Sequence, residues 1–378
     1  MTDSDAYRQS LAQRVARWRE FHNRNQPGDL MATVWGDRGT SLEGFLTGKF
    51  HEHGTEKMMG RAFLEACIEE YLALFRSDGR SEVVRFHDDC VPTALVYWGI
   101  GSCNAAITGG KPFHDGTTSW YEPELEWEQI EQLRFDPDNK WVQFALHVNH
   151  ALWRRWEEDF HILPFLYRSP LDAANGVRGN ELFLEMYTNP QAVHRLIDWC
   201  VDWSLEMERF LEANSHRPCP DGWGRAVWSC WLPDGAVFVN GDPVGLISRE
   251  MALEFEQPYT ARLFQSTGGG FYHNHTVGLY QTELVGKTPD NLLHYYVDDP
   301  HQPSAAEALL NMPQLRDEML ASSLETPIGM AVPIARLDET LEIAKDGRFL
   351  IVLVSDGDRG DEILQEGIDN VRRVSNID

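Results

Sequence analysis

Cysteine is scarce in this chain of 378 residues, since there are only six and no two form a CxxC pair. A chain this long can bury a sizeable core without a disulfide scaffold, so we expect reduced thiols and a cytoplasmic location. No run of about 18 apolar residues appears, and Met1–Gln13 lacks the apolar segment of a secretory signal peptide. No association with a membrane is expected.

Basic side chains are also few, with 33 Lys and Arg against 59 Asp and Glu, for a formal net charge of −26. A surface this acidic disfavours general binding to nucleic-acid backbones or anionic membranes, because both require positive charge. The sequence contains no GxGxxG loop, no Walker loop and no GxSxG elbow. Dinucleotide binding, P-loop chemistry and serine hydrolysis therefore lack their usual signatures.

What the sequence does contain is a succession of short apolar segments separated by amphipathic helices. Strands are predicted over Val83–Phe86, His161–Tyr167, Ala236–Val239, Gly270–Tyr272, Leu292–Val297, Ile328–Val332 and Phe349–Val354, with Lys111–Phe113 as a candidate eighth. Strands that are apolar on both faces indicate a parallel sheet covered by helices. The pattern alone does not separate a closed barrel from an open doubly wound sheet.

The N-terminal region is predicted to differ from the rest. Asp5–Asn23 has the three- and four-residue apolar spacing of a helix, whereas Gln26–Gly54 is rich in Gly, Asp and Thr and is expected to be irregular. Pro92 suits the first turn of a helix running toward Gly99. Pro218–Asp234, rich in Gly, Pro and Trp, is expected to form a loop or lid.

Polar residues suited to catalysis or metal binding follow several of the predicted strands. They are Asp88, Asp89, Asp242, His273, His275, Asp298, Asp299, Asp356 and Asp358. In an α/β barrel the carboxyl ends of all strands converge on one pocket, so these side chains are candidates for a single site. The alternative for each Asp is a helix cap or a turn.

His273-Asn274-His275 is the sharpest of these elements. Residues two apart on a strand face the same side, so both imidazoles could bind one divalent metal, with an Asp from another strand end as third ligand. The preceding Gly268-Gly269-Gly270 allows close backbone approach. The alternative is two histidines that hydrogen-bond a carboxylate or an anionic substrate without metal.

Other candidates have equally plain alternatives. Arg168 could hold an anionic substrate group or pair with Asp172. Cys90 could be a ligand or a buried apolar residue. The tryptophans of the Gly-rich segment, Trp223, Trp228 and Trp231, could wall a flat substrate or simply pack.

The order of the motifs resembles the uroporphyrinogen-decarboxylase-like superfamily over roughly residues 55–375. Gly241–Tyr259 (GDPVGLISREMALEFEQPY) is similar to that superfamily's D-x-x-G-L-(L/I)-S-P-E block, and Gly269–Gly278 (GGFYHNHTVG) to its H-x-C-G strand end. Leu166–Leu211 and His87–Gly101 resemble two further blocks. The resemblance implies a (β/α)8 TIM barrel over residues 55–378, with residues 1–54 as a helical and irregular extension packed on it.

The resemblance also implies chemistry, and the sequence departs from both of its main branches. The arginine-rich N-terminal motif of the true decarboxylase is absent, which argues against uroporphyrinogen as substrate. The branch that transfers methyl groups from corrinoid proteins to thiols holds zinc with H-x-C and a later Cys. Here His275 replaces that Cys, and no Cys follows Cys230. A His/His/Asp site is less thiophilic and suits zinc foremost, or manganese, cobalt or iron(II).

The leading hypothesis is therefore a metal-dependent methyltransferase or demethylase that acts on a small molecule with a corrinoid protein or a thiol or folate acceptor. The expected roles are metal ligation by His273, His275 and Asp356 (or Asp298), catalysis by Asp88, Asp89 and Asp242, and substrate binding by Arg168, Asp298 and Trp231. The alternatives are a metal-free decarboxylase or lyase acting on a small carboxylate, and a non-catalytic binding member. A homodimer is compatible with all three.

Overall fold

The computed structural model describes residues 3–35, 41–116, 118–122, 125–220, 222–355 and 360–377. The strands are β1 (Asp29–Val34), β2 (Thr93–Leu95), β3 (Phe113–His114), β4 (Ser119–Trp120), β5 (His161–Leu163), β6 (Tyr167–Arg168), β7 (Arg225–Val227), β8 (Cys230–Leu232), β9 (Val237–Asn240), β10 (Gly270–His275), β11 (Asn291–Val297), β12 (Ile328–Pro333) and β13 (Arg348–Val354).

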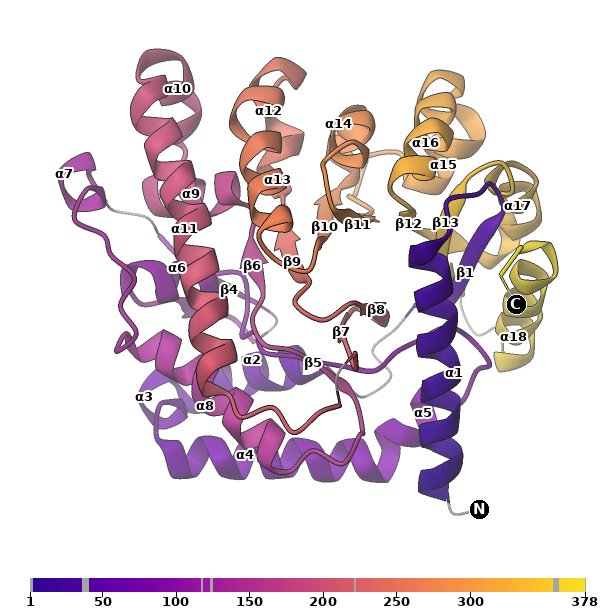
Figure 1. The fold of residues 1–378 in the computed structure, drawn as a ribbon, viewed down its shortest axis with the longest axis horizontal. Helices are drawn as coiled ribbons and strands as arrows, with labels where there is room; N and C mark the ends of the chain where they lie inside the picture. The colour runs from indigo at the N-terminus through magenta and orange to yellow at the C-terminus, as the bar shows by residue number, and fades with distance from the viewer. Residues whose placement is uncertain are drawn as a thin grey trace.

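The helices alternate with the strands through most of the chain (Figure 1). They are α1 (Asp3–Asn23), α2 (Leu42–His53), α3 (Thr55–Met58), α4 (Arg61–Leu74), α5 (Arg80–Val83), α6 (Ser102–Thr108), α7 (Trp127–Ile130), α8 (Lys140–Arg154), α9 (Pro170–Arg178), α10 (Glu181–Thr188), α11 (Pro190–Asn214), α12 (Arg249–Phe255), α13 (Gln257–Gln265), α14 (Thr282–Gly286), α15 (Ala305–Asn311), α16 (Pro313–Glu325), α17 (Leu337–Ala344) and α18 (Asp361–Val374). In the described part of the chain, none is both long and apolar enough to cross a bilayer.

A parallel sheet of seven strands organises the molecule, in the order β1-β13-β12-β11-β10-β9-β6. Alternate residues of β13 show that both faces are buried. Phe349, Ile351 and Leu353 join one apolar cluster with α15, α17 and α18, whereas Leu350 and Val352 join another on the opposite face. Burial on both faces explains why these strands are continuous apolar runs. The α/β class with a parallel sheet is confirmed.

The two edges of this sheet are met by further strands. β6 follows β5 after three residues, and β5 pairs in parallel with β2. The free edge of β1 is met by the segment that leads into β2, where the Asp89 N–H donates to the Ala32 carbonyl oxygen at 2.8 Å. β2 and β5 thus lie in sequence between the two edge strands, β1 and β6.

Several predictions near the N-terminus are wrong. Residues 26–54 are not irregular, because Asp29–Val34 forms β1 and Leu42–His53 forms α2. Val83–Phe86 is not a strand, since α5 ends at Val83 and turns follow. Pro92 precedes a strand rather than starting a helix. The structural reason is tertiary, because β1 pairs with β13, more than 300 residues away in sequence.

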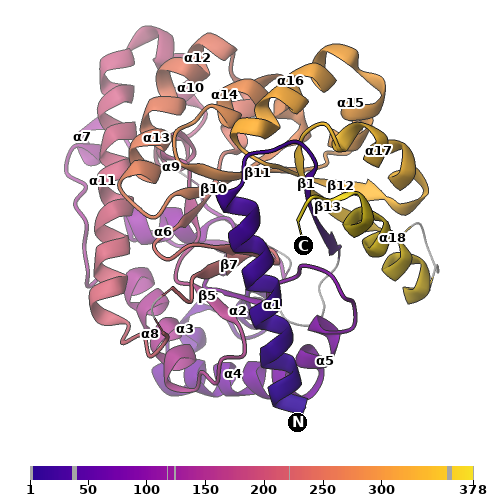
Figure 2. The ribbon, with the colours of Figure 1, turned by 45° about the vertical axis from the view of Figure 1, so that its right-hand side comes forward.

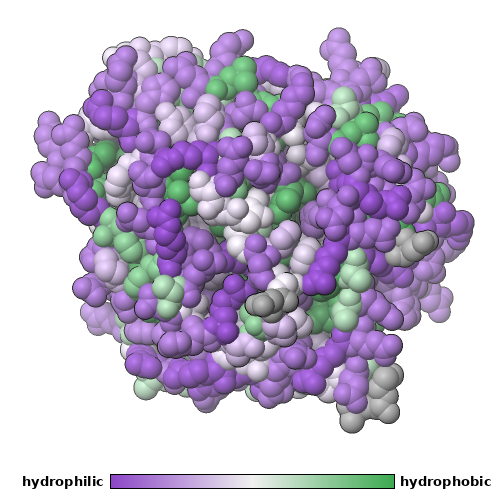
Figure 3. All heavy atoms as spheres, viewed as in Figure 1, coloured by the Kyte–Doolittle hydropathy of each residue, from purple (hydrophilic) through white to green (hydrophobic). Residues whose placement is uncertain are grey.

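Helix α1 packs along one side of the molecule, next to β1 and β8 and beside the C-terminal residues (Figure 2). The Arg17 guanidinium donates to the Ile377 carbonyl oxygen at 3.0 Å, which ties this helix to the end of the chain. The face drawn in Figure 3 is mostly hydrophilic, and its apolar side chains lie in small separate groups. This is the surface that the acidic composition predicts.

Candidate metal centre at the ends of β9, β10 and β11

Strand β10 carries both histidines of the HxH element to one side. His273 is buried, with 4% of its surface exposed, and His275 at the end of the strand is partly exposed. Asn274 between them points to the other face, where its Oδ1 accepts a hydrogen bond from Nε2 of the buried His294 ring at 2.8 Å. The period of two expected of a strand is therefore realised.

The glycines before and at the start of β10 are needed for close packing, as predicted. A Cβ atom on Gly270 would lie 1.9 Å from the Phe264 ring, and one on Gly268 would lie 2.2 Å from the Asp234 carbonyl oxygen. Gly269 also has a φ of +97°. Any side chain at these positions would push β10 away from its neighbours and move the histidines that follow.

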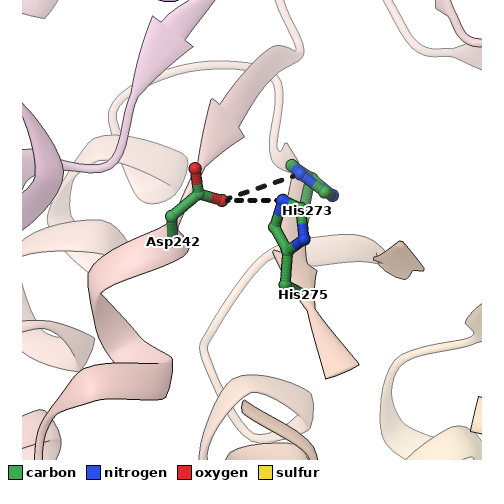
Figure 4. Close-up of side chains that lie close together, drawn as sticks. All are labelled: Asp242, His273 and His275. Atoms are coloured by element: carbon green, nitrogen blue, oxygen red, sulfur yellow. Dashed lines mark ion pairs between the residues drawn. The ribbon is translucent and has the colours of Figure 1, made fainter. Parts of the chain in front are cut away.

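Asp242 completes a cluster with the two histidines (Figure 4). Its Oδ1 atom lies 3.7 Å from His273 Nε2 and 3.6 Å from His275 Nε2. One donor atom from each of the three residues lies within 4.8 Å of the others, and Asp242 Oδ1 is buried without a hydrogen-bond partner. A buried carboxylate oxygen without a partner is costly, so this geometry favours a cation between the three side chains.

Each end of the cluster is held by a further polar residue. Asn240 Nδ2, at the end of β9, donates to Asp242 Oδ2 at 2.8 Å, which leaves Oδ1 to face the histidines. Asp299 follows β11, and its Oδ1 atom lies 2.8 Å from the Nδ1 atom of His275. Four side chains from three neighbouring strand ends are thus brought together with Asp242, which is the convergence that the sequence predicted for strand ends.

The protonation state of His273 follows from its surroundings. Burial, together with the smaller effect of the neighbouring His275 ring, lowers the pKa of His273 to about 3. A neutral imidazole at physiological pH is the form that coordinates a metal, and it lacks the positive charge that would attract an anion. The electrostatics therefore favour the metal interpretation over the anion-binding one.

Arg168, a predicted substrate ligand, stands at the same rim but is engaged with its own chain. Its Nε and Nη2 atoms both donate to the Asp172 carboxylate at 2.6 Å. Burial raises the pKa of Asp172 to about 6, against the lowering effect of Arg168. The pairing alternative for Arg168 is confirmed, and its charge is neutralised before any substrate arrives.

Asp88 and Asp89 lie elsewhere, in ion pairs with α1. Asp88 is 3.1 Å from Arg14, and Asp89 is 2.8 Å from Arg17, with both carboxylates buried. Their outer oxygens accept the Val34 and Ala32 N–H groups of β1 at 3.2 and 2.8 Å. Neither belongs to the group of donor atoms around Asp242. In the structure both carboxylates join α1 to the edge of β1, and the catalytic role expected of them stays a prediction.

Two other predicted residues are placed away from the cluster, and one lies outside the described residues. Asp298 accepts the Ala305 N–H at 3.2 Å at the start of α15. Trp231 packs on α1, where its ring lies 6.1 Å from that of His22. Asp356, predicted as third metal ligand, is not among the described residues. Among the described residues, Asp242 is the carboxylate that lies beside both histidines.

A cavity of about 310 Å³ lies next to the cluster. Its lining includes Thr33, Leu95, Trp228, Tyr295 and Val352, which come from β1, β2, the β7–β8 turn, β11 and β13. The Trp228 ring contacts the His273 ring at 4.8 Å between centroids and the Tyr295 ring at 5.6 Å. Trp228 therefore lines the cavity and also contacts one member of the cluster formed by Asp242, His273 and His275.

Trp228 reaches this position through an unusual turn. Residues 228 and 229 both have positive φ, at 44° and 69°, in the two-residue turn that joins β7 to β8. This conformation suits a hairpin turn but costs a bulky residue about 1–2 kcal/mol. The predicted lid is thus a hairpin, and of its tryptophans it is Trp228 that lines the cavity.

Sequence reasoning missed Asn240 as a cluster residue, and of the Asp298-Asp299 pair it selected Asp298 for substrate binding, whereas Asp299 is the one that contacts His275. The sequence offered a clue to each residue, because Asn240 directly follows the predicted strand Ala236–Val239 and Asp299 is adjacent to Asp298. Which of two adjacent carboxylates turns inward depends on the helix start that follows. Comparison with known proteins adds no assignment: no family model matches the chain, and no curated protein matches it significantly.

Proposed function

We propose that this protein is a divalent-metal-dependent enzyme whose metal is held by Asp242, His273 and His275. The observation that carries the proposal is the buried Asp242 Oδ1, which faces two imidazole Nε2 atoms at 3.6 and 3.7 Å and has no hydrogen-bond partner. Three protein ligands with an open position are typical of catalytic zinc sites, whereas structural sites are closed by four.

The donor set fits a metal, but not the thiolate site of the methyl-transferring branch. Among the described residues, the group of possible ligands contains one carboxylate and two imidazoles and no cysteine. Five of the six cysteines are buried. Zinc suits this set, and so do manganese, cobalt and iron(II), because the oxygen donor makes the site harder.

A closed (β/α)8 barrel is the architecture we propose around this site. The strands β1, β2, β5–β6, β9, β10, β11, β12 and β13 would form a ring in sequence order. Support comes from the β2–β5 and β6–β9 pairings and from the hydrogen bond between Asp89 and Ala32 beside β1. Sequential parallel strands with a site at their carboxyl ends also agree with the resemblance to the uroporphyrinogen-decarboxylase-like superfamily.

The reaction we propose is methyl transfer or demethylation of a small molecule, with a thiol, a folate or a partner protein's corrinoid as acceptor. The methyl carbon exchanges its bond to the donor for one to the acceptor, and a thiol acceptor also loses its proton. When bound, the metal would supply Lewis acidity, which lowers the pKa of a thiol or polarises a substrate oxygen.

The chain's own side chains would position the reactants. His273, neutral because burial lowers its pKa, offers a lone pair to the site, and Asp242 offers negative charge. Trp228 and Tyr295 line the cavity beside His273, so a bound substrate would lie against aromatic rings and displace water from the cluster.

The two alternatives have less support. A metal-free lyase needs a free cation for the carboxylate, but Arg168 is engaged by Asp172 and His273 is neutral. A non-catalytic member is expected to have lost its convergent polar groups, whereas here Asp242 and both histidines converge.

The test is metal binding by the whole purified protein. Elemental analysis and titration with zinc and cobalt are expected to show about one equivalent per chain in the wild type. The double variant His273→Ala/His275→Ala is expected to lose it, because two of three ligands are gone. The double variant His87→Ala/His301→Ala is the control, since both side chains are exposed and outside the cluster. A wild type that binds none of zinc, cobalt, manganese or iron(II) would contradict the proposal.

A further inference from the structure

We propose that Asp299 is the positioning residue of the metal site, which fixes the tautomer and the direction of the His275 ring. This inference rests on the proposed function, because it assigns an outer partner to one of the metal ligands. Asp299 Oδ1 lies 2.8 Å from His275 Nδ1, while the opposite ring atom, Nε2, faces Asp242 Oδ1 at 3.6 Å. The carboxylate and the proposed metal thus lie on opposite sides of one imidazole.

The chemistry of a neutral imidazole gives this contact its consequence. Such a ring carries one N–H donor and one lone-pair acceptor. Because a carboxylate only accepts hydrogen bonds, the proton must be on Nδ1 for the 2.8 Å contact to be a hydrogen bond. The lone pair is then on Nε2, the atom directed at the cluster, and the ring is held in the tautomer that can bind a cation.

Asp299 is itself held in place by the backbone around it. Its Oδ2 accepts the Val277 N–H at 2.9 Å, and its own N–H donates to Thr276 Oγ1 at 2.9 Å. These bonds join the end of β11 to the turn that follows β10. Both carboxylate oxygens are therefore used, one for the ring and one for the turn, so the side chain has little freedom to rotate.

The two histidines are held by different means, which isolates the role of Asp299. The His273 ring lies between aromatic groups, with Trp228 at 4.8 Å and Phe238 at 6.1 Å between centroids, and is buried. The His275 side chain is 34% exposed and has no comparable packing on both sides among the described residues. Its orientation therefore depends on the hydrogen bond to Asp299.

The neighbouring Asp298 provides a matched control within the chain. It carries the same carboxyl group one residue earlier, but its Oδ1 accepts the Ala305 N–H at the start of α15. Replacing either residue by Asn removes one negative charge from the same segment. Only the change at Asp299 alters the hydrogen bond to His275.

The experiment is cobalt(II) titration of the full-length wild type, Asp299→Ala, Asp299→Asn and Asp298→Asn, followed by calorimetry and by the visible spectrum of the bound ion. Asp299→Ala is expected to weaken cobalt binding by about 10–100-fold and to change the spectrum, as loss of a carboxylate–histidine contact does in known metal sites. Asp299→Asn keeps an acceptor oxygen without the charge, so its affinity should lie between those of Asp299→Ala and the wild type. Asp298→Asn should bind as the wild type does.

The outcomes separate the two proposals. Suppose that the wild type binds cobalt and that Asp299→Ala and Asp299→Asn both bind it with the wild-type affinity and spectrum. This result would overturn the role of Asp299 and leave the proposed metal site unaffected. A wild type that binds no metal would overturn both. Circular dichroism would show whether Asp299→Ala folds. If it does not, the comparison of Asp299→Asn with Asp298→Asn decides, because each replaces a carboxylate by an amide of nearly the same size.

Discussion

Replacing Asp89 by Ala should destabilise the protein strongly, although this residue lies outside the cluster of Asp242, His273 and His275. Its carboxylate is fully buried and accepts hydrogen bonds from Arg17 Nε at 2.8 Å, the Ala32 N–H at 2.8 Å and Arg372 Nη2 at 3.4 Å. Truncation leaves two guanidinium groups without their shared partner and a strand N–H without an acceptor. This one side chain therefore joins α1, α18 and β1.

The magnitude can be worked out from these partners. Breaking a buried ion pair costs about 3–5 kcal/mol, and an unsatisfied buried N–H costs about 1–3 kcal/mol. Water can reach part of both arginines, because Arg17 is 14% and Arg372 33% exposed, which reduces the sum. We expect a loss of about 3–4 kcal/mol for Asp89→Ala, a large share of the roughly 5–15 kcal/mol of a typical domain.

Urea unfolding followed by tryptophan fluorescence measures this loss. Asp361→Asn is the control, because Asp361 forms an exposed pair with Arg85 at 2.6 Å and such pairs contribute about 0–1 kcal/mol. Asp89→Asn retains an acceptor for the Ala32 N–H and should lose less than Asp89→Ala. If Asp89→Ala were as stable as Asp361→Asn, the structural role assigned to Asp89 would be wrong. Weakened metal binding in a folded Asp89→Asn protein would point back to a role in the site.

Two further changes test the packing around β10. Burial raises the pKa of Glu256 to about 7, although the side chain accepts three hydrogen bonds from hydroxyl groups that lower it. The contribution of the protonated Glu256 to the free energy of unfolding is therefore fully present below pH 4.5 and is lost as the pH rises through 7. Glu256→Gln cannot ionise and should gain up to about 3 kcal/mol relative to the wild type between pH 4.5 and 8.5 in urea unfolding; a pH-independent difference would contradict this. Gly270→Ala should cost about 1–3 kcal/mol, since its Cβ would lie 1.9 Å from Phe264, whereas Gly48→Ala in helix α2, with open space around its Cβ, should be neutral or stabilising. Equal thermal midpoints for these two variants would refute the packing argument.

Much of the sheet could be predicted from the sequence because its strands are buried on both faces. The predicted strands that end at Val239, Val297 and Val354 match β9, β11 and β13 to within one residue at each end. The placement of His273 and His275 on one side followed from the alternation of a strand, which depends only on local geometry. The position of an apolar strand and the alternation of its side chains can be predicted without knowing which elements pack against it.

The failures come where local signals are ambiguous. Asp29–Val34 lies in a segment rich in Gly and Asp, and it becomes a strand through pairing with β13 and through hydrogen bonds to Asp88 and Asp89. Val83–Phe86 has strand-like composition, yet its first residue is the last residue of helix α5 and turns follow. A short apolar run is compatible with either element, so the partner decides.

The sequence by itself determined the class of fold, the alternation of strands and helices, and the common face of the two histidines, because these depend on periodicity and burial within short segments. Tertiary structure decided which acidic residue joins those histidines. Asp88 and Asp89 are neutralised by arginines of α1, Asp298 caps a helix, and Asp242 and Asp299 are directed to the rings. Carboxylates that follow strands look alike in sequence, and their different roles depend on partners that only folding brings within hydrogen-bonding distance.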